Sequence, residues 1–578
     1  MSTTGIRMTS HHLRRKRLKL ISISMVILLL ILYYLSKSYR QGIHVRSVHG
    51  NETIEKDIHQ NDIPFIRTNG ERLSDLGLSP SHKLVEIYDP KTGKKRLIHG
   101  RFLHITDMHP DSLYEAGTSM DQVCHYGKPK GKGDTALKFG TAMGGCDSSM
   151  DLIEHTLRWI GENLRDEIDF VVWTGDNIRH DNDRKNPRTE FEIFDMNELI
   201  AGRMETLFGS QESDDPREFD VNVIPSLGNN DVFPHNMFSL GPTLQTREVY
   251  NIWNNFIPQE QRRFFGIGAS FLTEVIPGKL AVLSINTLYL FKANPLVDNC
   301  NSRKEPGYTL LVWLGNTLQE FRKRGMKVWL TGHVPPLEKN FESSCYNKFT
   351  LWTHEYRDII IGGLYGHMNV DHFIPVDGKK ARRNINIPKN VFNNKDTAEN
   401  EDDADEIFLQ HADPGREVRL MGAKPVNKET YMKGVRDKIY KKVHDKLASV
   451  KAENAARRNG PRTVDDIYER YSIVNIAGSI IPTFNPSFRV WEYNITDLDI
   501  NKEQQQFVPW DEFFSTLEKE IQDSDDMQDI DNSMLVAKKK KRVDKTIPKK
   551  IAKECIPLAQ HIPLSCLLQQ NLFNITQI

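Results

Sequence analysis

Five apolar segments of this chain each end in a side chain that can bind a metal ion. The segments read FLHIT, FVVWTG, VIPSLG, VWLTG and IIIGGLYG, and the residues that follow them are Asp107, Asp176, Asn229, His333 and His367. Short apolar segments predict buried strands, and strand ends are where α/β folds place their chemistry. Because all five segments end in oxygen or nitrogen donors, packing alone explains them poorly. The pattern predicts a site with two metal ions that hydrolyses a phosphate bond.

The segments between these strands have helical spacing. Residues 148–165 and 309–324 each carry apolar side chains along one face, with Asp147 or Ser148 as the expected N-cap of the first helix. Strands that alternate with helices, with connections long enough for crossovers, indicate an α/β fold.

The donors divide between two ions. Asp176 is the candidate bridging carboxylate, because it follows a strongly apolar strand within Thr-Gly-Asp-Asn. Asp107 and His109 lie two residues apart where the chain leaves a strand, so a turn would let both face one ion. The donors expected at the second ion are Asn229, His333 and His367.

A basic segment precedes an unbroken apolar run near the N-terminus. Residues 14–19 contain five cations, and residues 20–36 follow as the candidate transmembrane anchor. No small-residue cleavage site follows, which favours a retained signal anchor over a cleaved peptide. The positive-inside rule then places residues 1–19 in the cytosol and the residues from 37 onward in a lumen. The alternative is a buried core helix, although nothing nearby could cover a helix that is apolar all round.

Two further features agree with a lumenal location. Glycosylation sequons, which also arise by chance, begin at Asn51, Asn494 and Asn574. Six cysteines would pair in an oxidising compartment, whereas free thiols would indicate a cytosolic protein. The sequence leaves the connectivity open. Order along the chain suggests Cys124 with Cys146, Cys300 with Cys345, and Cys555 with Cys566.

Changes in composition divide the chain into regions. Residues 37–96 are polar and resemble a stem, and residues 97–377 form the expected catalytic domain. Residues 378–465 carry basic and acidic runs and indicate a charged, partly disordered insertion. Residues 466–515 are expected to add strands that complete the catalytic domain, and 516–578 form a charged tail. The formal net charge of zero argues against nucleic acid as a partner.

The motifs Asp-x-His, Gly-Asp-Asn, Gly-Asn-Asn-Asp, Gly-His and Gly-His-x-Asn resemble, in this order, those of the calcineurin-like metallophosphoesterases. The acid-sphingomyelinase-like branch is the most similar. Its second motif continues to a histidine, here His180, a cysteine-bounded loop follows its first motif, and Asn-Pro-x-Phe-Arg-Val recurs, here at 485–490. The anchor, the insertion and the Gly-Asn-Asn-Asp variant resemble the fungal vacuolar endopolyphosphatases. The resemblance covers residues 98–377 and 471–494, and implies a β-sandwich flanked by helices.

The resemblance also implies two divalent ions per subunit. Their ligands would be Asp107, His109, Asp176, Asn229, His333 and His367, with Asp176 shared. Asn369 stands where the family usually has a further histidine ligand. An amide oxygen in place of an imidazole favours Mg, Mn or Co over Zn, without fixing the identity.

Asn230 stands where many members of the family have a histidine that assists the leaving group. An alkoxide needs a proton as it departs, whereas phosphate leaving a phosphoanhydride is already a stable anion. Asn230 therefore fits anhydride cleavage, and His180 remains as a candidate donor or phosphate anchor. Polyphosphate also needs cations along a groove. Candidates after the last metal motif are Lys379, Lys380, Arg382 and Arg383, and the alternative for this run is a solvated loop.

The anchor predicts a single-pass type II protein with a lumenal domain, and the resemblance implies that this domain lies in the vacuole and cuts inorganic polyphosphate within the chain. The resemblance further implies processing by vacuolar proteases. The close alternatives are a sphingomyelinase-like phosphodiesterase, which the cysteine-free stem disfavours, and a nucleotide pyrophosphohydrolase. A non-catalytic polyphosphate-binding membrane protein is the alternative of a different class, and the retained Asp176 speaks against it.

Overall fold

The computed structural model describes residues 84–88, 93–386, 432–456, 469–495, 508–519 and 544–549, with a few single positions besides. The chain divides into two units, and the second, His82–Ile578, holds every element described below. Within the described ranges, no helix combines the length and the apolar character that crossing a bilayer requires. The predicted anchor at 20–36 lies outside the described residues, as do Asn51, Asn574, Cys555 and Cys566. The predicted domain boundaries stay predictions.

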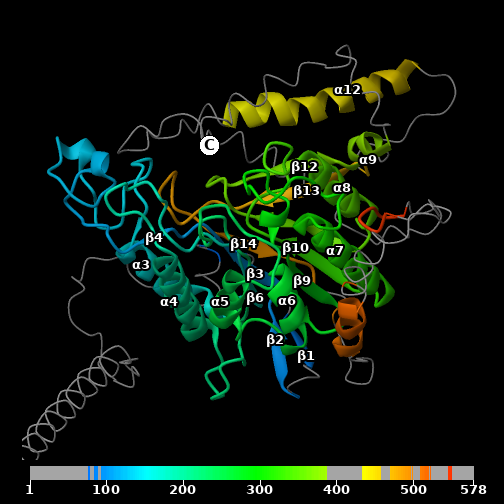
Figure 1. The fold of residues 1–578 in the computed structure, drawn as a ribbon, viewed down its shortest axis with the longest axis horizontal. Coiled ribbons are helices and arrows are strands. Elements are labelled where there is room, and N and C mark those ends of the chain that lie inside the picture. The colour runs from blue at the N-terminus through cyan, green and yellow to red at the C-terminus, as the bar shows by residue number, and fades with distance from the viewer. Residues whose placement is uncertain are drawn as a thin grey trace, which may run out of the picture. The chain divides into compact units, whose positions relative to one another are not determined.

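Two sheets form the centre of the fold (Figure 1). The smaller sheet has the order β14 (Arg489–Glu492), β3 (Arg101–Ile105), β6 (Phe170–Trp173) and β7 (Asn222–Pro225). The larger sheet has the order β12 (His372–Asp377), β13 (Tyr471–Ile476), β11 (Ile360–Tyr365), β10 (Lys327–Thr331), β9 (Leu280–Ser284) and β8 (Phe271–Ile276). The five strands predicted to end in metal donors are present as β3, β6, β7, β10 and β11.

Strands β3, β6 and β7 run parallel, as do β9, β10, β11 and β13, whereas β14, β12 and β8 are antiparallel to their neighbours. Every residue of β3, β6 and β9 is buried, as expected for parallel strands covered on both faces. The sheets meet through aromatic rings, with Phe102 and Trp329 centred 5.6 Å apart. This parallel arrangement brings the donor-bearing strand ends to one edge.

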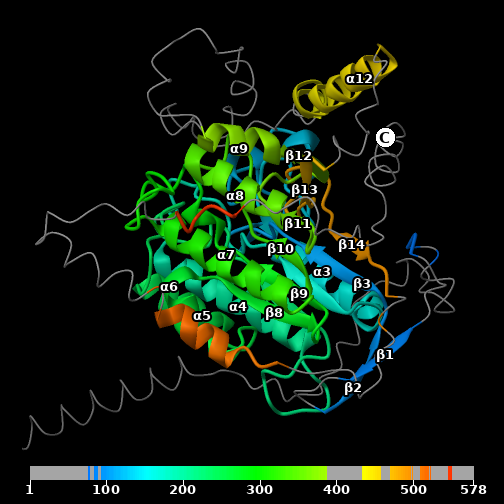
Figure 2. The same cartoon turned by 90° about the vertical axis from the view of Figure 1, so that its right-hand side faces the viewer.

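Helices cover the outer faces of the sheets. Helices α3 (Met150–Asn163) and α4 (Glu190–Phe208) flank the smaller sheet, followed by α5 (Leu244–Trp253) and α6 (Arg262–Gly268). Helices α7 (Pro306–Lys323) and α8 (Ser343–Glu355) pack on the larger sheet (Figure 2). The predicted α/β class is therefore confirmed.

One helix boundary differs from the expectation. The N-cap of α3 is Ser149, whose hydroxyl accepts the Leu152 N–H at 3.2 Å, rather than Asp147 or Ser148. Asp147 is engaged elsewhere, by the backbone and the ring of His180. A carboxylate directly before a helix is ordinarily read as a cap, which is why the sequence pattern misled here.

Chain on both sides of the charged insertion enters the same sheets. Strand β13 lies between β11 and β12, and β14 extends the smaller sheet at β3. The described part of the insertion begins with α9 (Gly378–Asn386) and resumes as a π-helical segment, η9 (Val435–Tyr440), that continues into α12 (Lys441–Ala456). The Tyr440 hydroxyl donates to the Phe373 carbonyl at 2.8 Å, which secures η9 to β12.

Two short pairings complete the described strands. β1 (Val85–Tyr88) and β2 (Lys95–Ile98) form an antiparallel hairpin, and β4 (Pro110–Asp111) pairs with β5 (Ser148–Ser149) in parallel. The second pairing brings the chain just before α3 against the chain that follows β3.

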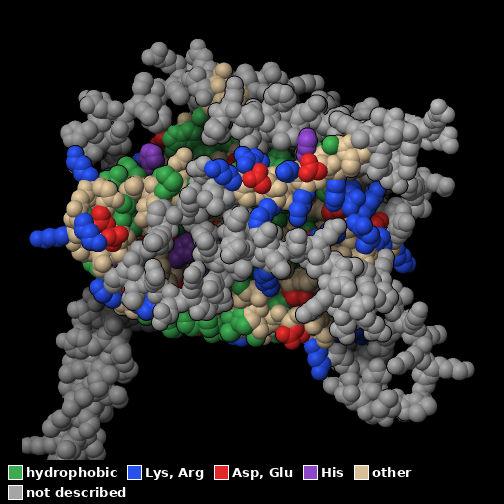
Figure 3. All heavy atoms as spheres, turned by 90° about the horizontal axis from the view of Figure 1, so that it is seen from above, with side chains coloured by type: hydrophobic (Ala, Val, Ile, Leu, Met, Phe, Trp, Pro, Cys, Tyr) green, Lys and Arg blue, Asp and Glu red, His purple; other side chains and the backbone are tan. Residues whose placement is uncertain are grey.

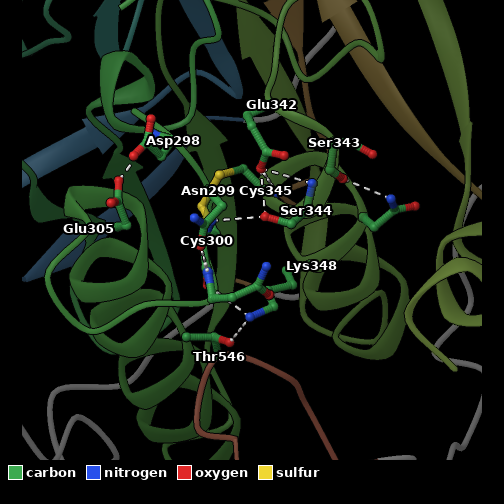
Figure 4. Close-up of a disulfide and its surroundings, with 12 residues drawn as sticks. Asp298, Asn299, Cys300, Glu305, Glu342, Ser343, Ser344, Cys345, Lys348 and Thr546 are labelled. Atoms are coloured by element: carbon green, nitrogen blue, oxygen red, sulfur yellow. Dashed lines mark hydrogen bonds between the residues drawn. A yellow bond between two sulfur atoms is a disulfide. The ribbon is translucent and has the colours of Figure 1, made fainter. Parts of the chain in front are cut away.

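Two of the three suggested disulfides are present, joining Cys124 to Cys146 and Cys300 to Cys345. The second ties the chain before α7 to the first turn of α8 (Figure 4). Beside it, the buried Lys348 ammonium donates to the Cys300 carbonyl at 2.8 Å and to the Thr546 hydroxyl at 2.6 Å. Residues 544–549 are thereby attached to α8.

Candidate metal centre

The donor side chains at the five strand ends converge on one place. We call Asp107, His109, Asp176, Asn229, His333 and His367 the donor cage. Strands β3, β6 and β7 contribute from the smaller sheet, and β10 and β11 from the larger one. Both sheets are therefore needed to assemble the cage.

One half of the donor cage lies around the Asn229 amide oxygen. That oxygen is 2.8 Å from His333 Nε2 and 2.8 Å from His367 Nδ1. His333 Nε2 is also 3.1 Å from Asp176 Oδ2. Four potential ligand atoms thus face a common point.

The other half shares the same carboxylate oxygen. His109 Nε2 lies 3.3 Å from Asp176 Oδ2 and 3.7 Å from Asp107 Oδ1. Because Asp176 Oδ2 approaches both His109 and His333, Asp176 occupies the position that a bridging ligand between two ions requires.

Hydrogen bonds on the outer side of the cage orient two histidine rings and the Asn229 amide so that their potential ligand atoms face inward. His109 Nδ1 and His333 Nδ1 face the carbonyls of Ile178 and Thr174 at 3.0 and 2.7 Å, which leaves both Nε2 atoms pointing into the cage. The Asn229 amide nitrogen donates to Asn236 Oδ1 at 3.0 Å, so its oxygen faces inward.

Asn369, the predicted seventh ligand, has a buried side-chain oxygen without a hydrogen-bond partner among the described residues. A buried, unsatisfied oxygen is costly unless something binds it. Together with the oriented histidines, this oxygen shows that the residues fit a divalent metal centre.

The cage is backed by close backbone approaches. A Cβ atom on Gly228 would lie 2.2 Å from the Asp176 nitrogen, and one on Gly366 would lie 2.5 Å from Asp107 Oδ2. Only glycine fits at these two positions, because any side chain would displace a donor.

Several donors have unusual backbone conformations. Ten non-glycine residues in the described ranges have positive φ, and five of them are predicted ligands. Those five are Asp107 at 48°, His109 at 42°, Asp176 at 60°, His367 at 70° and Asn369 at 57°. Strain of this kind persists where the surrounding structure enforces it, and it gathers at functional sites.

Charges within the cage are strongly coupled. Burial opposes ionisation of Asp176, but His333 and His109 outweigh it and hold the pKa of Asp176 well below its ordinary value. Burial lowers the pKa of His333, but Asp176 and Asp107 more than offset this and raise it to about 9. A protonated imidazole cannot ligate, so metal binding to this site must release protons.

His180 is held beside the cage by a carboxylate. Its Nδ1 lies 2.6 Å from Asp147 Oδ1, and its backbone N–H donates to Asp147 Oδ2 at 2.9 Å. The imidazole stacks on His109 with ring centres 4.0 Å apart, and the His180 side chain is 38% exposed. His109, Asp147 and His180 also lie close enough to hold an ion. However, both ring nitrogens of His109 are engaged by the cage and by Ile178, so a histidine–aspartate pair explains the group better.

Asn230 contacts the carboxylate of Asp176 directly. Its backbone N–H donates to Asp176 Oδ1 and its amide nitrogen to Asp176 Oδ2, both at 2.8 Å. Asp231 fixes the same turns, accepting the N–H groups of Asp176 at 2.9 Å, Asn177 at 2.6 Å and Gly228 at 2.9 Å. The Gly-Asn-Asn-Asp motif therefore positions Asp176 as well as supplying Asn229.

A second carboxylate–histidine group supports the loops around the cage. His125 Nε2 is 2.7 Å from Asp111 Oδ2, and its Nδ1 is 2.7 Å from Asp183 Oδ2. His125 is buried and follows the disulfide-bonded Cys124. We call Asp111, His125, Asp147, His180 and Asp183 the supporting loops, because all five lie outside the strands of the two main sheets, Asp111 in the short strand β4 and the other four on loops.

The basic residues after the last motif lie on α9 against α8. Lys380 Nζ pairs with Glu338 at 2.8 Å, and Arg382 pairs with the buried Glu355. Arg383 is exposed, and Lys379 belongs to the same helix. The face in Figure 3 likewise carries groups of Lys and Arg side chains, some beside acidic ones. Lys380 and Arg382, two of the four predicted substrate-binding cations, therefore already form ion pairs within the protein. The sequon asparagine Asn494 is exposed.

Sequence reasoning did not identify Asp147, His125, Asp183 or Asn236 as parts of the site. The rule of donors at strand ends cannot find them, since each lies within a loop or before a helix. A usable signal for Asp147 and His125 was adjacency to cysteines, because each directly follows a residue of the first disulfide.

Comparison with known proteins agrees with this geometry. The profile of the Calcineurin-like phosphoesterase family matches residues 100–371. An endopolyphosphatase of Saccharomyces cerevisiae is 57% identical over 568 residues, which span 93% of this chain and 83% of that protein. An endopolyphosphatase of Candida glabrata is 55% identical over 499 residues, which span 83% of this chain and 73% of that protein. This chain therefore belongs to the calcineurin-like metallophosphoesterases, in the family of the fungal endopolyphosphatases.

Proposed function

We propose that this chain is a metal-dependent hydrolase that cuts phosphoanhydride bonds within inorganic polyphosphate. The observation that carries the proposal is the shared Asp176 oxygen, which lies 3.3 Å from His109 and 3.1 Å from His333 at the junction of two donor sets. The substrate class is supported by the extensive match to proteins named endopolyphosphatase.

The donor cage would hold two divalent ions, which supply Lewis-acid activation of water and of phosphoryl oxygens when bound. Asn230 keeps the bridging carboxylate in place through two hydrogen bonds. His180, with Nδ1 engaged by Asp147, presents Nε2 to the substrate and can donate a hydrogen bond or a proton there. The leaving group of an anhydride is a stable anion, so this chemistry tolerates Asn230 in place of an imidazole.

The metal identity is part of the proposal. Amide oxygens at Asn229 and Asn369 make the site harder than an all-histidine one, which favours Mg, Mn or Co over Zn. Metal analysis of the purified protein is expected to find two ions per chain, with activity restored by these cations. Tight stoichiometric zinc alone would contradict the preference.

Incubation of the purified protein with long-chain polyphosphate and each divalent cation tests the function. Gel separation should show the whole population shortening, as internal cuts require. Free phosphate without shortening of most chains would indicate attack from the ends. Turnover of nucleotides or sphingomyelin analogues alone would overturn the substrate class. Asp176→Asn should abolish whichever activity appears, because it weakens the bridging ligand.

We also propose a lumenal catalytic domain anchored by residues 20–36 in the vacuole membrane. Two disulfides support an oxidising compartment, and the exposed Asn494 is accessible for glycosylation. A glycosidase-sensitive mass and protection from added protease in intact vesicles are the expected results. Cleavage of the domain by protease outside intact vesicles would refute this orientation. Sequencing of the mature termini would test the expected proteolytic processing.

A further inference from the structure

Two buried arginines lie nine residues apart on the loop that follows β6, and among the described residues only the Arg179 guanidinium has a carboxylate partner. Arg179 donates from Nε and Nη2 to the two carboxylate oxygens of Glu192 at 2.9 and 3.3 Å. Arg188, which is 5% exposed, forms none of the ion pairs found in the described part of the chain. Its Nε is buried and has no hydrogen-bond partner there. The charge of Arg179 is therefore neutralised by an ion pair, whereas the equally buried guanidinium of Arg188 has no ion-pair partner among the described residues.

Backbone contacts place Arg188 next to the donor cage. Its Nη1 donates to the carbonyl of Arg179 at 3.0 Å and to that of Asn230 at 3.1 Å. Arg179 precedes His180, and Asn230 follows the cage residue Asn229. The guanidinium thus joins the loop that carries the accessible histidine to the turn that holds the bridging carboxylate.

A buried cation without an ion-pair partner is expensive, and this one lies beside a site that would hold two divalent ions. Burial lowers the pKa of Arg188, against the opposing fields of Asp181, Asp176 and Asp147. Two divalent ions would bring four positive charges, which the carboxylates Asp107 and Asp176 cannot neutralise. A guanidinium keeps its charge under such conditions and presents a planar fork that suits phosphate oxygens. The missing counter-charge is therefore best supplied by an anionic ligand.

We propose that Arg188 forms a phosphate-binding subsite beside the donor cage, where it holds a phosphate group of the substrate next to the metal centre. The unpartnered Nε, the absence of an ion pair to the guanidinium among the described residues and the link to Asn230 all point to an anion at this position, whereas the nearby Asp181 carboxylate accepts only the Arg188 backbone N–H, at 3.1 Å. The subsite rests on the proposed function for the identity of its substrate, polyphosphate. The chemistry that it recognises, a phosphate oxygen, does not depend on that identity.

Calorimetric titration of the metal-loaded protein with inorganic phosphate tests the subsite without turnover. Arg188→Gln should weaken phosphate binding by about tenfold or more, the scale of one charge-assisted hydrogen bond. Arg188→Lys keeps the positive charge but loses the planar guanidinium, so its phosphate affinity should lie between those of wild type and Arg188→Gln. With polyphosphate as substrate, KM should rise from wild type to Arg188→Lys to Arg188→Gln, and kcat should change less than KM.

Arg203→Gln is the matched control, because this substitution removes the same charge at a different type of site. Arg203 lies on α4, where it forms a half-exposed ion pair with Glu154. The Arg203→Gln protein should bind phosphate as wild type does. Metal content and thermal unfolding establish that each variant is folded and loaded, and Arg188→Lys remains informative if Arg188→Gln does not fold.

Wild-type phosphate affinity in a folded Arg188→Gln or Arg188→Lys protein would overturn the proposal. So would parallel losses of metal and kcat with phosphate affinity unchanged, because that pattern assigns Arg188 to loop structure alone. If wild type fails to cut polyphosphate while Arg188→Gln still weakens phosphate binding, the subsite stands and the proposed function falls.

Discussion

The donor cage and the supporting loops use the same residue types but are built differently. Cage residues follow buried strands directly, and their positions are set by the hydrogen-bond register of two sheets. The supporting loops lie between strands, and their histidines are fixed by carboxylates distant in sequence, 33 residues away for His180 and 58 for the Asp183 contact of His125. The difference teaches that the two sheets set the positions of the donor atoms, whereas the loops set the orientation of the groups around them.

The largest effect should come from removing a cage donor. His333 is fully buried, and its Nε2 lies within 3.1 Å of both Asn229 and Asp176 oxygens. His333→Ala should therefore lower polyphosphate hydrolysis by more than about 100-fold, beyond the roughly 10- to 100-fold cost of residues that only support ligands. Metal analysis should show the loss of one ion per chain. Full metal content in this variant would mean that His333 is not a ligand.

His104 provides the matched control for that experiment. It is equally buried on β3, but its Nε2 contacts the Thr174 hydroxyl at 3.0 Å instead of a cage oxygen. His104→Ala should lower thermal stability through the cavity it leaves and keep the metal stoichiometry.

An intermediate effect is expected from the supporting loops at Asp147. Asp147→Asn removes the charge that orients the His180 ring, so kcat should fall by about 10- to 100-fold with little change in metal content. In a His180→Ala background the same substitution should have almost no further effect, since both residues act through one imidazole. Additive losses would show that Asp147 acts independently. Asp151→Asn, at an exposed site on α3, is the control.

The smallest effect should be a pH dependence of stability at His125. Only an imidazolium can donate to both Asp111 and Asp183. Burial lowers the pKa of His125, but the two carboxylates outweigh it and leave the pKa above its ordinary value of 6.5. A raised folded-state pKa gives stability that is complete below 6.5 and is lost as the pH rises through the folded value.

Chemical unfolding of wild type and His125→Gln across this range measures the effect. The advantage of wild type should be greatest near pH 5.5 and shrink by about 1.5 kcal/mol towards pH 8.5, the lower end of the range for a hydrogen bond to a charged group. A constant difference at all pH values would show that folding leaves the pKa of His125 unchanged, and an advantage that shrinks as the pH falls would show that His125 stays neutral in the folded protein.

The donor cage could be predicted from the sequence, whereas most of the supporting loops could not. Apolar segments ending in donors located all five strands and the six cage residues, because burial and strand ends leave a local signature. Asp147 was read as a helix cap because its partner, His180, approaches only after the chain has crossed to β6. Arg188 lies among ordinary charged loop residues, and its missing partner is visible only in three dimensions. The same limit applies to α9, where Lys380 and Arg382 read as free cations but pair with Glu338 and Glu355.

The Lys348 contact near the C-terminus bears on how the protein can be shortened. Thr546 accepts from the buried ammonium at 2.6 Å, and its carbonyl accepts from the Trp352 indole at 2.8 Å. A version trimmed after β14 or after the helix at 511–519 would remove Thr546 and leave both buried donors of α8 without these acceptors. Recombinant boundaries chosen for biochemistry should therefore extend past residue 549, even though the strands that assemble the cage end far earlier.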